Sequence, residues 1–142
     1  MKFAILCSGK QKPKSLRELT DVYLQRIRRM ARIEEREVAD DRALAKGIVP
    51  GAHVVTLEVR GRQLTSEAFA RQIEAWASTG KGDICFVIGG ADGLPEEVRQ
   101  RSAFELSLSP FTLPHRLARL ILLEQIYRGL TILRGEPYAR ED

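Results

Sequence analysis

The sequence is poor in the residues that build metal sites, disulfide scaffolds and membrane spans. Its 142 residues include only two cysteines and two histidines. Cys7 and Cys85 stand far apart without the CxxC spacing of zinc sites, so we expect neither a disulfide framework nor a bound metal. No apolar run approaches the roughly 18–20 residues that cross a bilayer, and Phe3–Cys7 is shorter than a signal-peptide core of about 7–15 residues. We therefore expect a cytoplasmic protein that does not enter a membrane.

The residues that are present suit one folded domain, which we expect to span residues 1–142. Apolar residues make up 44% and charged residues 30% of the chain, as in ordinary globular proteins. The formal net charge is only +4, but Met1–Arg32 holds nine basic and two acidic residues. Lys10, Lys12 and Lys14 form a basic loop there, and an arginine cluster follows at Arg26–Arg32. We expect both groups to contact phosphate, although a solvated helix end also explains the arginines.

Apolar runs alternate with helical patterns along the chain. The predicted strands are Lys2–Cys7, Ile33–Val38, His53–Val59, Asp83–Ile88 and Glu105–Ser109. Helices are predicted after Ser15, within Asp40–Gly47, after Thr65 or Ser66, after Pro95, and over His115–Leu133. Ser15 and Glu18 have the spacing of a capping box, and Arg60–Arg62 is expected to turn the chain. The alternation predicts an α/β fold with a mostly parallel sheet flanked by helices.

Two loops that follow predicted strands are candidate ligand sites. Gly89–Gly93 comes directly after an apolar run typical of a strand buried on both faces, and parallel sheets bind ligands at this end. Its pattern is neither a dinucleotide fingerprint nor a phosphate loop, and a tight strand–helix turn also explains it. Leu106–His115 contains two prolines and several hydroxyl groups, which suit a rigid ligand loop or an ordinary turn. His115 itself could be a surface residue at the start of a helix.

The last predicted helix is apolar on most sides, which indicates that a second chain covers part of it. Arg119 could be solvated. Arg128 could be buried and paired, or could face an anionic ligand. The terminal Pro137–Arg140 could be a frayed end or a tail that stacks on RNA.

Taken together, several blocks resemble the SPOUT-class ribosomal RNA methyltransferases of the large-subunit methyltransferase H family. Besides the N-terminal strand and basic loop, they are Val55–Glu58, Phe86–Leu94, Leu106–His115, and Leu123–Arg128 followed by Pro137–Tyr138. The resemblance implies a single SPOUT domain with a C-terminal trefoil knot, and a homodimer. It also implies transfer of a methyl group from S-adenosylmethionine to N3 of a pseudouridine in 23S ribosomal RNA, on assembled ribosomes. The alternatives are the same chemistry on another RNA, such as tRNA, and an RNA-binding module without transfer activity.

The resemblance also implies roles for individual residues. The cofactor-binding residues are Leu57, Gly89, Gly90, Leu108, Ser109, Pro110, Phe111, Thr112 and Leu113. His115 and Arg128 lie near the RNA side of the site, where we expect His115 to accept the proton from N3 and Arg128 to stabilise the negative base. Tyr138 and Arg140 are expected to bind RNA beside the basic loop, from the tail of the partner subunit.

Overall fold

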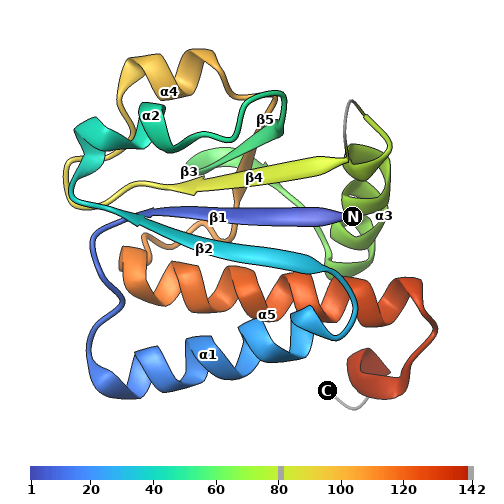
Figure 1. Cartoon of the computed structure of the whole chain (residues 1–142). Helices are drawn as coiled ribbons and strands as arrows, with labels where there is room; N and C mark the ends of the chain where they lie inside the picture. Colours follow the sequence, from blue (N-terminus) through green and yellow to red (C-terminus); the bar gives the residue numbers. More distant parts are fainter. Residues whose placement is uncertain (80–81, 141–142) are drawn as a thin grey trace.

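The computed structural model describes residues 1–79 and 82–140, which form one parallel sheet with helices on both faces (Figure 1). The strands are β1 (Lys2–Ser8), β2 (Arg32–Val38), β3 (His53–Gln63), β4 (Asp83–Ile88) and β5 (Phe104–Ser107). They are arranged in the order β2-β1-β4-β3-β5, and every pairing is parallel. The predicted α/β fold with a parallel sheet is confirmed.

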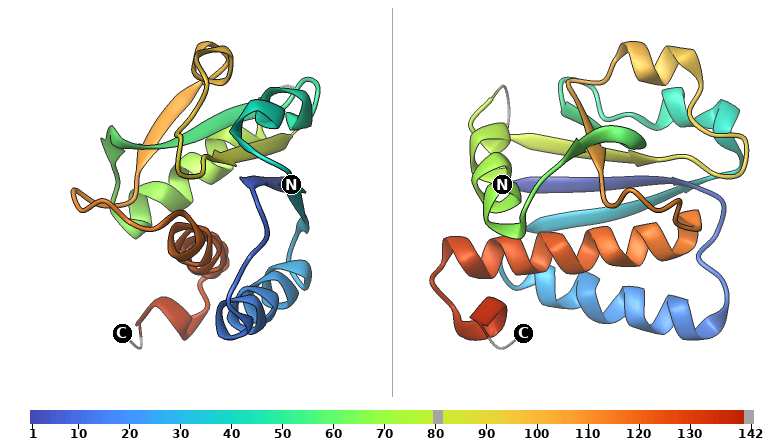
Figure 2. Two further views of the ribbon diagram at one scale, coloured as in Figure 1. Left: turned by 90° about the vertical axis from the view of Figure 1, so that its left-hand side faces the viewer. Right: turned by 180° about the vertical axis from the view of Figure 1, so that it is seen from behind.

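The helices divide between the two faces of the sheet (Figure 2). The longer helices α1 (Lys14–Arg28), α3 (Ser66–Ala77) and α5 (His115–Leu133) pack against one face. The short helices α2 (Leu44–Gly47) and α4 (Glu96–Gln100) cover the other. Two 3-10 turns complete the chain, η1 (Asp41–Ala43) and η2 (Pro137–Arg140). No helix of the described residues is long and apolar enough to span a membrane.

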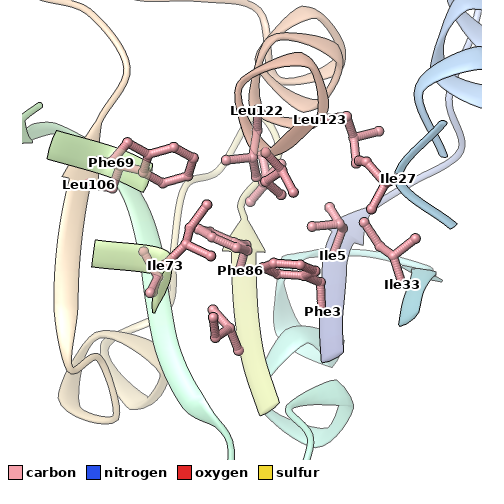
Figure 3. Close-up of a cluster of buried hydrophobic side chains, with 14 of the residues drawn as sticks. Phe3, Ile5, Ile27, Ile33, Phe69, Ile73, Phe86, Leu106, Leu122 and Leu123 are labelled. Carbon is pink, nitrogen blue, oxygen red and sulfur yellow. The ribbon is translucent and has the colours of Figure 1, made fainter. Parts of the chain in front are cut away.

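The main core lies between the sheet and the three longer helices (Figure 3). Phe86 on β4 is fully buried, and its ring lies 6.4 Å from that of Phe3 and 6.1 Å from that of Phe69. Because β4 lies between β1 and β3 with helices on both faces, all its residues after Asp83 are buried. This position explains why the strand is a continuous apolar run instead of an alternating one.

The start of α1 differs from the prediction. The helix begins at Lys14 with the extended Pro13 as its N-cap, and no side chain caps it. Ser15 therefore lies inside the first turn, where its hydroxyl cannot act as the expected N-cap. The buried face of the helix is formed by Thr20, Leu24 and Ile27. By contrast, Thr65 caps α3 as predicted, since its Oγ1 accepts a hydrogen bond from the amide of Ala68 at 3.1 Å.

The predicted turn at Arg60–Arg62 is wrong, because these residues continue β3. Leu106 of β5 is the register partner of both Leu57 and Arg62, so β3 has an irregularity between them. A side chain at Gly61 would place its Cβ 2.5 Å from the carbonyl oxygen of Glu105. The glycine thus permits the close approach of two backbones, and it does not end the strand.

Candidate active site

A cavity of about 330 Å³ lies at the carboxyl end of β4, the edge at which parallel sheets bind ligands. Three separate segments form its wall: residues 57–59 of β3, residues 88–91 from the end of β4, and residues between 106 and 115 from the end of β5. Ala118, on the first turn of α5, completes the lining. The two loops singled out in the sequence therefore meet at one site.

The structure brings eight of the nine predicted cofactor-binding residues to this cavity. These are Leu57, Gly89, Gly90, Leu108, Ser109, Phe111, Thr112 and Leu113. Pro110 is not part of the wall.

The cavity wall is mainly apolar, with backbone polar groups between the side chains. Leu57, Leu106 and Leu113 supply apolar surface, and glycine residues leave backbone groups uncovered along the β4 loop. The loop after β5 is held by its own hydroxyls, since Ser107 Oγ donates to the carbonyl of Ser109 at 3.0 Å and Ser109 Oγ accepts from the amide of Phe111 at 2.9 Å. Such a lining suits a small molecule with a flat apolar part and a few hydrogen-bonding groups.

The glycines after β4 lie in tight surroundings that leave little space for a side chain. A Cβ at Gly89 would lie 3.0 Å from the carbonyl carbon of Gly93, and one at Gly90 would lie 3.2 Å from Oγ of Ser8. Gly93 adopts a φ of 80°, in the left-handed region. The tight-turn interpretation of this loop is therefore correct, and the turn also lines the cavity.

Asp41 holds this loop in place, a role that no sequence pattern predicted. Its carboxylate, 7% exposed, accepts hydrogen bonds from the amides of Gly90 at 2.6 Å and Asp92 at 3.0 Å. Because Asp41 belongs to η1, nearly 50 residues earlier in the chain, no local pattern links it to the glycine loop. It acts as a positioning residue beneath the cavity.

His115 is the first residue of α5 and lines the cavity. Partial burial lowers its pKa from the ordinary value of 6.5, and the positive charges of Arg116 and Arg119 lower it further. The imidazole is therefore neutral at pH 7 and able to accept a proton.

Arg128 lies on the same helix but far from the cavity of its own chain. Thirteen residues separate it from His115, which corresponds to about 20 Å along a helix. Its Nη2 donates to Oε2 of Glu124 at 2.7 Å, and its guanidinium carbon lies 5.0 Å from the ring centre of Tyr138. Of the two alternatives for Arg128, the structure shows the paired one.

The C-terminal tail packs on its own chain, at the end of α5 opposite the cavity (Figure 1). The Tyr138 hydroxyl donates to Oε2 of Glu124 at 2.8 Å and lies 3.3 Å from the hydroxyl of Tyr23. Its ring is edge-on to that of Tyr127, with centres 4.6 Å apart. Burial, together with hydrogen bonds to Tyr23 and Glu124, raises the pKa of Tyr138, so its hydroxyl stays protonated. Tyr138 is thus ordered, while Arg140 next to it is exposed.

The predicted phosphate-binding residues occupy opposite edges of the sheet. The exposed Lys10, Lys12 and Lys14 follow β1, at the edge that carries the cavity. The arginine cluster Arg26–Arg32 lies at the other edge, where α1 ends and β2 begins. The two groups therefore form separate surfaces.

An ion network around the buried Arg119 anchors the start of the basic loop. Arg119 is fully buried, and its Nη1 donates to Glu35 at 2.9 Å and to Glu37 at 2.6 Å. Its Nη2 donates to the carbonyl of Gly9 at 3.0 Å, and Glu37 also accepts from the amide of Gln11 at 2.8 Å. The solvated alternative for Arg119 is wrong.

Across the described part of the chain, no group of three or more His, Cys, Asp or Glu side chains could hold a metal ion.

Comparison with known proteins gives consistent matches. A family model described as a predicted SPOUT methyltransferase matches residues 1–139. Ribosomal RNA large subunit methyltransferase H from Sorangium cellulosum is 49% identical over 144 residues, which cover 98% of this chain and 99% of that protein.

Solved structures match the fold at low sequence identity. A probable methyltransferase from Bordetella pertussis has a TM-score of 0.61 at 10% identity, covering 91% of this chain and 94% of that one. An AdoMet-bound rRNA methyltransferase from Sinorhizobium meliloti has a TM-score of 0.52 at 12% identity, and the match covers 91% of this chain and 57% of that one.

Proposed function

Because the chain belongs to the SPOUT methyltransferase family, we propose that it methylates large-subunit ribosomal RNA with S-adenosylmethionine as methyl donor. The observation that carries this proposal is the cavity at the carboxyl end of β4, with its apolar lining and glycine loop. A relative matched over nearly its full length is named as an rRNA large subunit methyltransferase, which supports this substrate class. We assign the acceptor as N3 of a pseudouridine in 23S rRNA, modified on the assembled ribosome in the cytoplasm.

The cavity suits the methyl donor in shape and chemistry. Its apolar residues, such as Leu57, Leu108 and Leu113, would enclose an adenine ring, and backbone groups of the two loops would bind its nitrogens. When bound, S-adenosylmethionine supplies a methyl group already activated on a sulfonium. The protein then has to orient the acceptor, remove its proton and exclude water.

We assign to His115 the role of accepting the N3 proton. It lines the cavity, and its lowered pKa keeps the imidazole in the neutral form at pH 7. The resulting ring anion would be stabilised by a cation, the role we assign to Arg128.

Arg128 would act in the cavity of a second copy of the chain. Within one chain it clusters with Tyr138 at the far end of α5, so the cation and the tail would reach a partner's site together. Apolar side chains beside the cavity are available for such a dimer, since Phe111 is 79% and Leu117 38% exposed. Covering them would also enclose the acceptor.

Mass mapping of rRNA from a deletion strain tests the substrate. We expect one methyl group to disappear from a pseudouridine of 23S rRNA and to return when the intact gene is supplied. An unchanged rRNA with a methyl group missing from tRNA would favour the tRNA alternative. Calorimetry with S-adenosylmethionine tests the cofactor separately, because an RNA-binding module without transfer activity would show no binding.

A further inference from the structure

A second cavity lies at the edge of the sheet opposite the candidate active site. We call it the N-edge cavity; its volume is about 540 Å³, and it is formed where β1, β2 and β4 begin and α1 ends. Its wall carries four cationic side chains and one carboxylate. They are Lys2, Arg28, Arg29, Arg32 and Asp83.

The positive charge of this cavity is not neutralised within the described residues 1–79 and 82–140. All four cationic side chains are exposed, and none of them forms an ion pair there, whereas Arg17 and Arg119 each bind carboxylates. The dipole of α1 favours cations at its last turn, which accounts for Arg28. It does not account for Lys2 and Arg32, which belong to strands. The convergence of cations from three elements indicates an anionic partner.

We infer that the N-edge cavity binds a phosphodiester segment of the RNA substrate, away from the nucleotide that is methylated. This inference rests on the proposed function. Arginine guanidinium groups bind phosphate oxygens with two parallel hydrogen bonds, and several cations spread over one wall suit a chain of phosphates. Asp83 would repel a phosphate placed against it, so the RNA backbone passes over the arginine side of the cavity.

One strand connects the two cavities. Asp83, the first residue of β4, lines the N-edge cavity, and Ile88, its last residue, lines the active-site cavity. Ile88 follows Asp83 by five residues, which corresponds to about 17 Å along a strand. One RNA molecule can therefore contact both cavities, but a single nucleotide cannot. The N-edge cavity accordingly contributes RNA affinity without contacting the methyl donor.

The test compares RNA binding of the full-length protein with that of an Arg29→Gln/Arg32→Gln variant over a series of salt concentrations. The probe is a fluorescently labelled single-stranded RNA oligonucleotide. Each lost phosphate contact lowers the slope of log affinity against log salt by about 0.7. We expect the slope to fall by about 1.4 in the double variant, and the affinity at 0.1 M salt to fall about 25-fold.

A Lys46→Gln/Arg71→Gln variant is the matched control, because it removes the same charge from exposed positions outside this cavity. We expect it to retain the wild-type slope. An unchanged slope in the arginine variant, or an equal loss in the control, overturns the inference. So does a matching loss of S-adenosylmethionine affinity or melting temperature, because the arginines would then serve the fold. If the wild type fails to methylate rRNA but the slope changes as expected, the proposed function fails and the RNA site remains.

Discussion

At the scale of single residues, Asp41 and His115 connect the fold to the chemistry of the cavity. Asp41 fixes the glycine loop through two short hydrogen bonds to backbone amides, although it does not line the cavity. His115 lines it and is held neutral by burial and by neighbouring arginines. Asp41 therefore shapes the wall, and His115 is the residue that we propose acts on the acceptor.

We expect Asp41→Asn to weaken S-adenosylmethionine binding about tenfold, because a hydrogen bond to a charged group contributes about 1.5–3 kcal/mol. Calorimetry measures the dissociation constant, and a thermal melt confirms that the variant is folded. Asp40→Asn is the control: Asp40 caps η1 through the amide of Ala43 and is exposed, and asparagine is an equally good cap. Equal weakening in both variants would show that Asp41 has no special link to the loop.

The rate of methyl transfer should fall as the pH drops through the lowered pKa of His115. That pKa lies below the ordinary 6.5, so the imidazole stays neutral to a lower pH. The fall in rate on the acid side of the pH–rate profile (the acid limb) should therefore lie below pH 6.5. His115→Gln should remove this limb and slow transfer about 10²–10⁴-fold.

His53→Gln serves as the control for the pH experiment. Burial also lowers the pKa of His53, but this residue begins β3 and does not line the cavity. An acid limb that survives in His115→Gln, or disappears in His53→Gln, would refute the assignment of His115 as base.

At the scale of elements, most strands and helices could be predicted from local patterns. The apolar run Asp83–Ile88 and the bounds of α5 match the structure, because burial on many sides leaves a strong local signal. The continuation of β3 through Arg60–Arg62 could not be predicted, since it depends on the approach of β5 more than 40 residues later. The same holds for Asp41 and for the ion network of Arg119, whose partners are distant in sequence. Seven of the eight predicted cofactor residues that line the cavity lie on two recognisable loops, and the eighth, Leu57, lies on β3.

The Arg119 network joins α5 to β2 and to the loop after β1. We expect Arg119→Met to lower the free energy of unfolding by about 1–3 kcal/mol, because Glu35, Glu37 and the carbonyl of Gly9 lose a fully buried hydrogen-bond donor, while Arg17 stays paired with the two carboxylates. Urea denaturation measures the loss. The triple change Arg119→Met/Glu35→Gln/Glu37→Gln also removes the two carboxylates that Arg119 binds, and it should recover part of the lost stability. No recovery would mean that packing, and not charge pairing, is the main contribution of Arg119.

The same network predicts how the free energy of unfolding changes with pH. Burial alone would raise the pKa of Glu37, but hydrogen bonds from Arg119 and Gln11 and the charge of Arg17 hold it below the ordinary 4.5. The unfolded chain therefore takes up this proton first, and the contribution of Glu37 is present above pH 4.5 and lost as the pH falls below it. Urea titrations from pH 3 to 7 should show a weaker acid dependence in Glu37→Gln. An identical pH dependence in the two proteins would contradict this.

At the scale of the whole molecule, the functional groups are spread over both edges of the sheet. The cavity, His115 and the basic loop lie at one edge, and Arg128, the tail and the arginine cluster lie toward the other. The modest net charge of +4 conceals this division. A dimer in which each chain completes the other's site would bring Arg128 and the tail of one chain to the cavity of its partner, and would leave the arginine cluster to contact more distant RNA.

A mixture of two inactive variants tests this arrangement. His115→Gln lacks the proposed base, and Arg128→Ala lacks the proposed cation, so we expect each alone to be nearly inactive while still binding S-adenosylmethionine. If Arg128 acts in the partner's cavity, each mixed dimer regains one complete site. Random mixing makes half of the dimers mixed, so we expect about a quarter of wild-type activity in a methylation assay. An inactive mixture, with mixed dimers demonstrated by mass spectrometry, would place Arg128 in its own chain's site.

The order in which the cavity wall appears along the chain has a consequence for biosynthesis. The wall takes residues 57–59 first, residues 88–91 next, and the segment from 106 to Ala118 last. A nascent chain that has not yet released this last segment from the ribosome lacks one side of the cavity, and β3 has not yet gained β5 as a neighbour. The cavity that we propose binds the methyl donor is therefore complete only after the chain has been synthesised through Ala118 and that residue has left the ribosome.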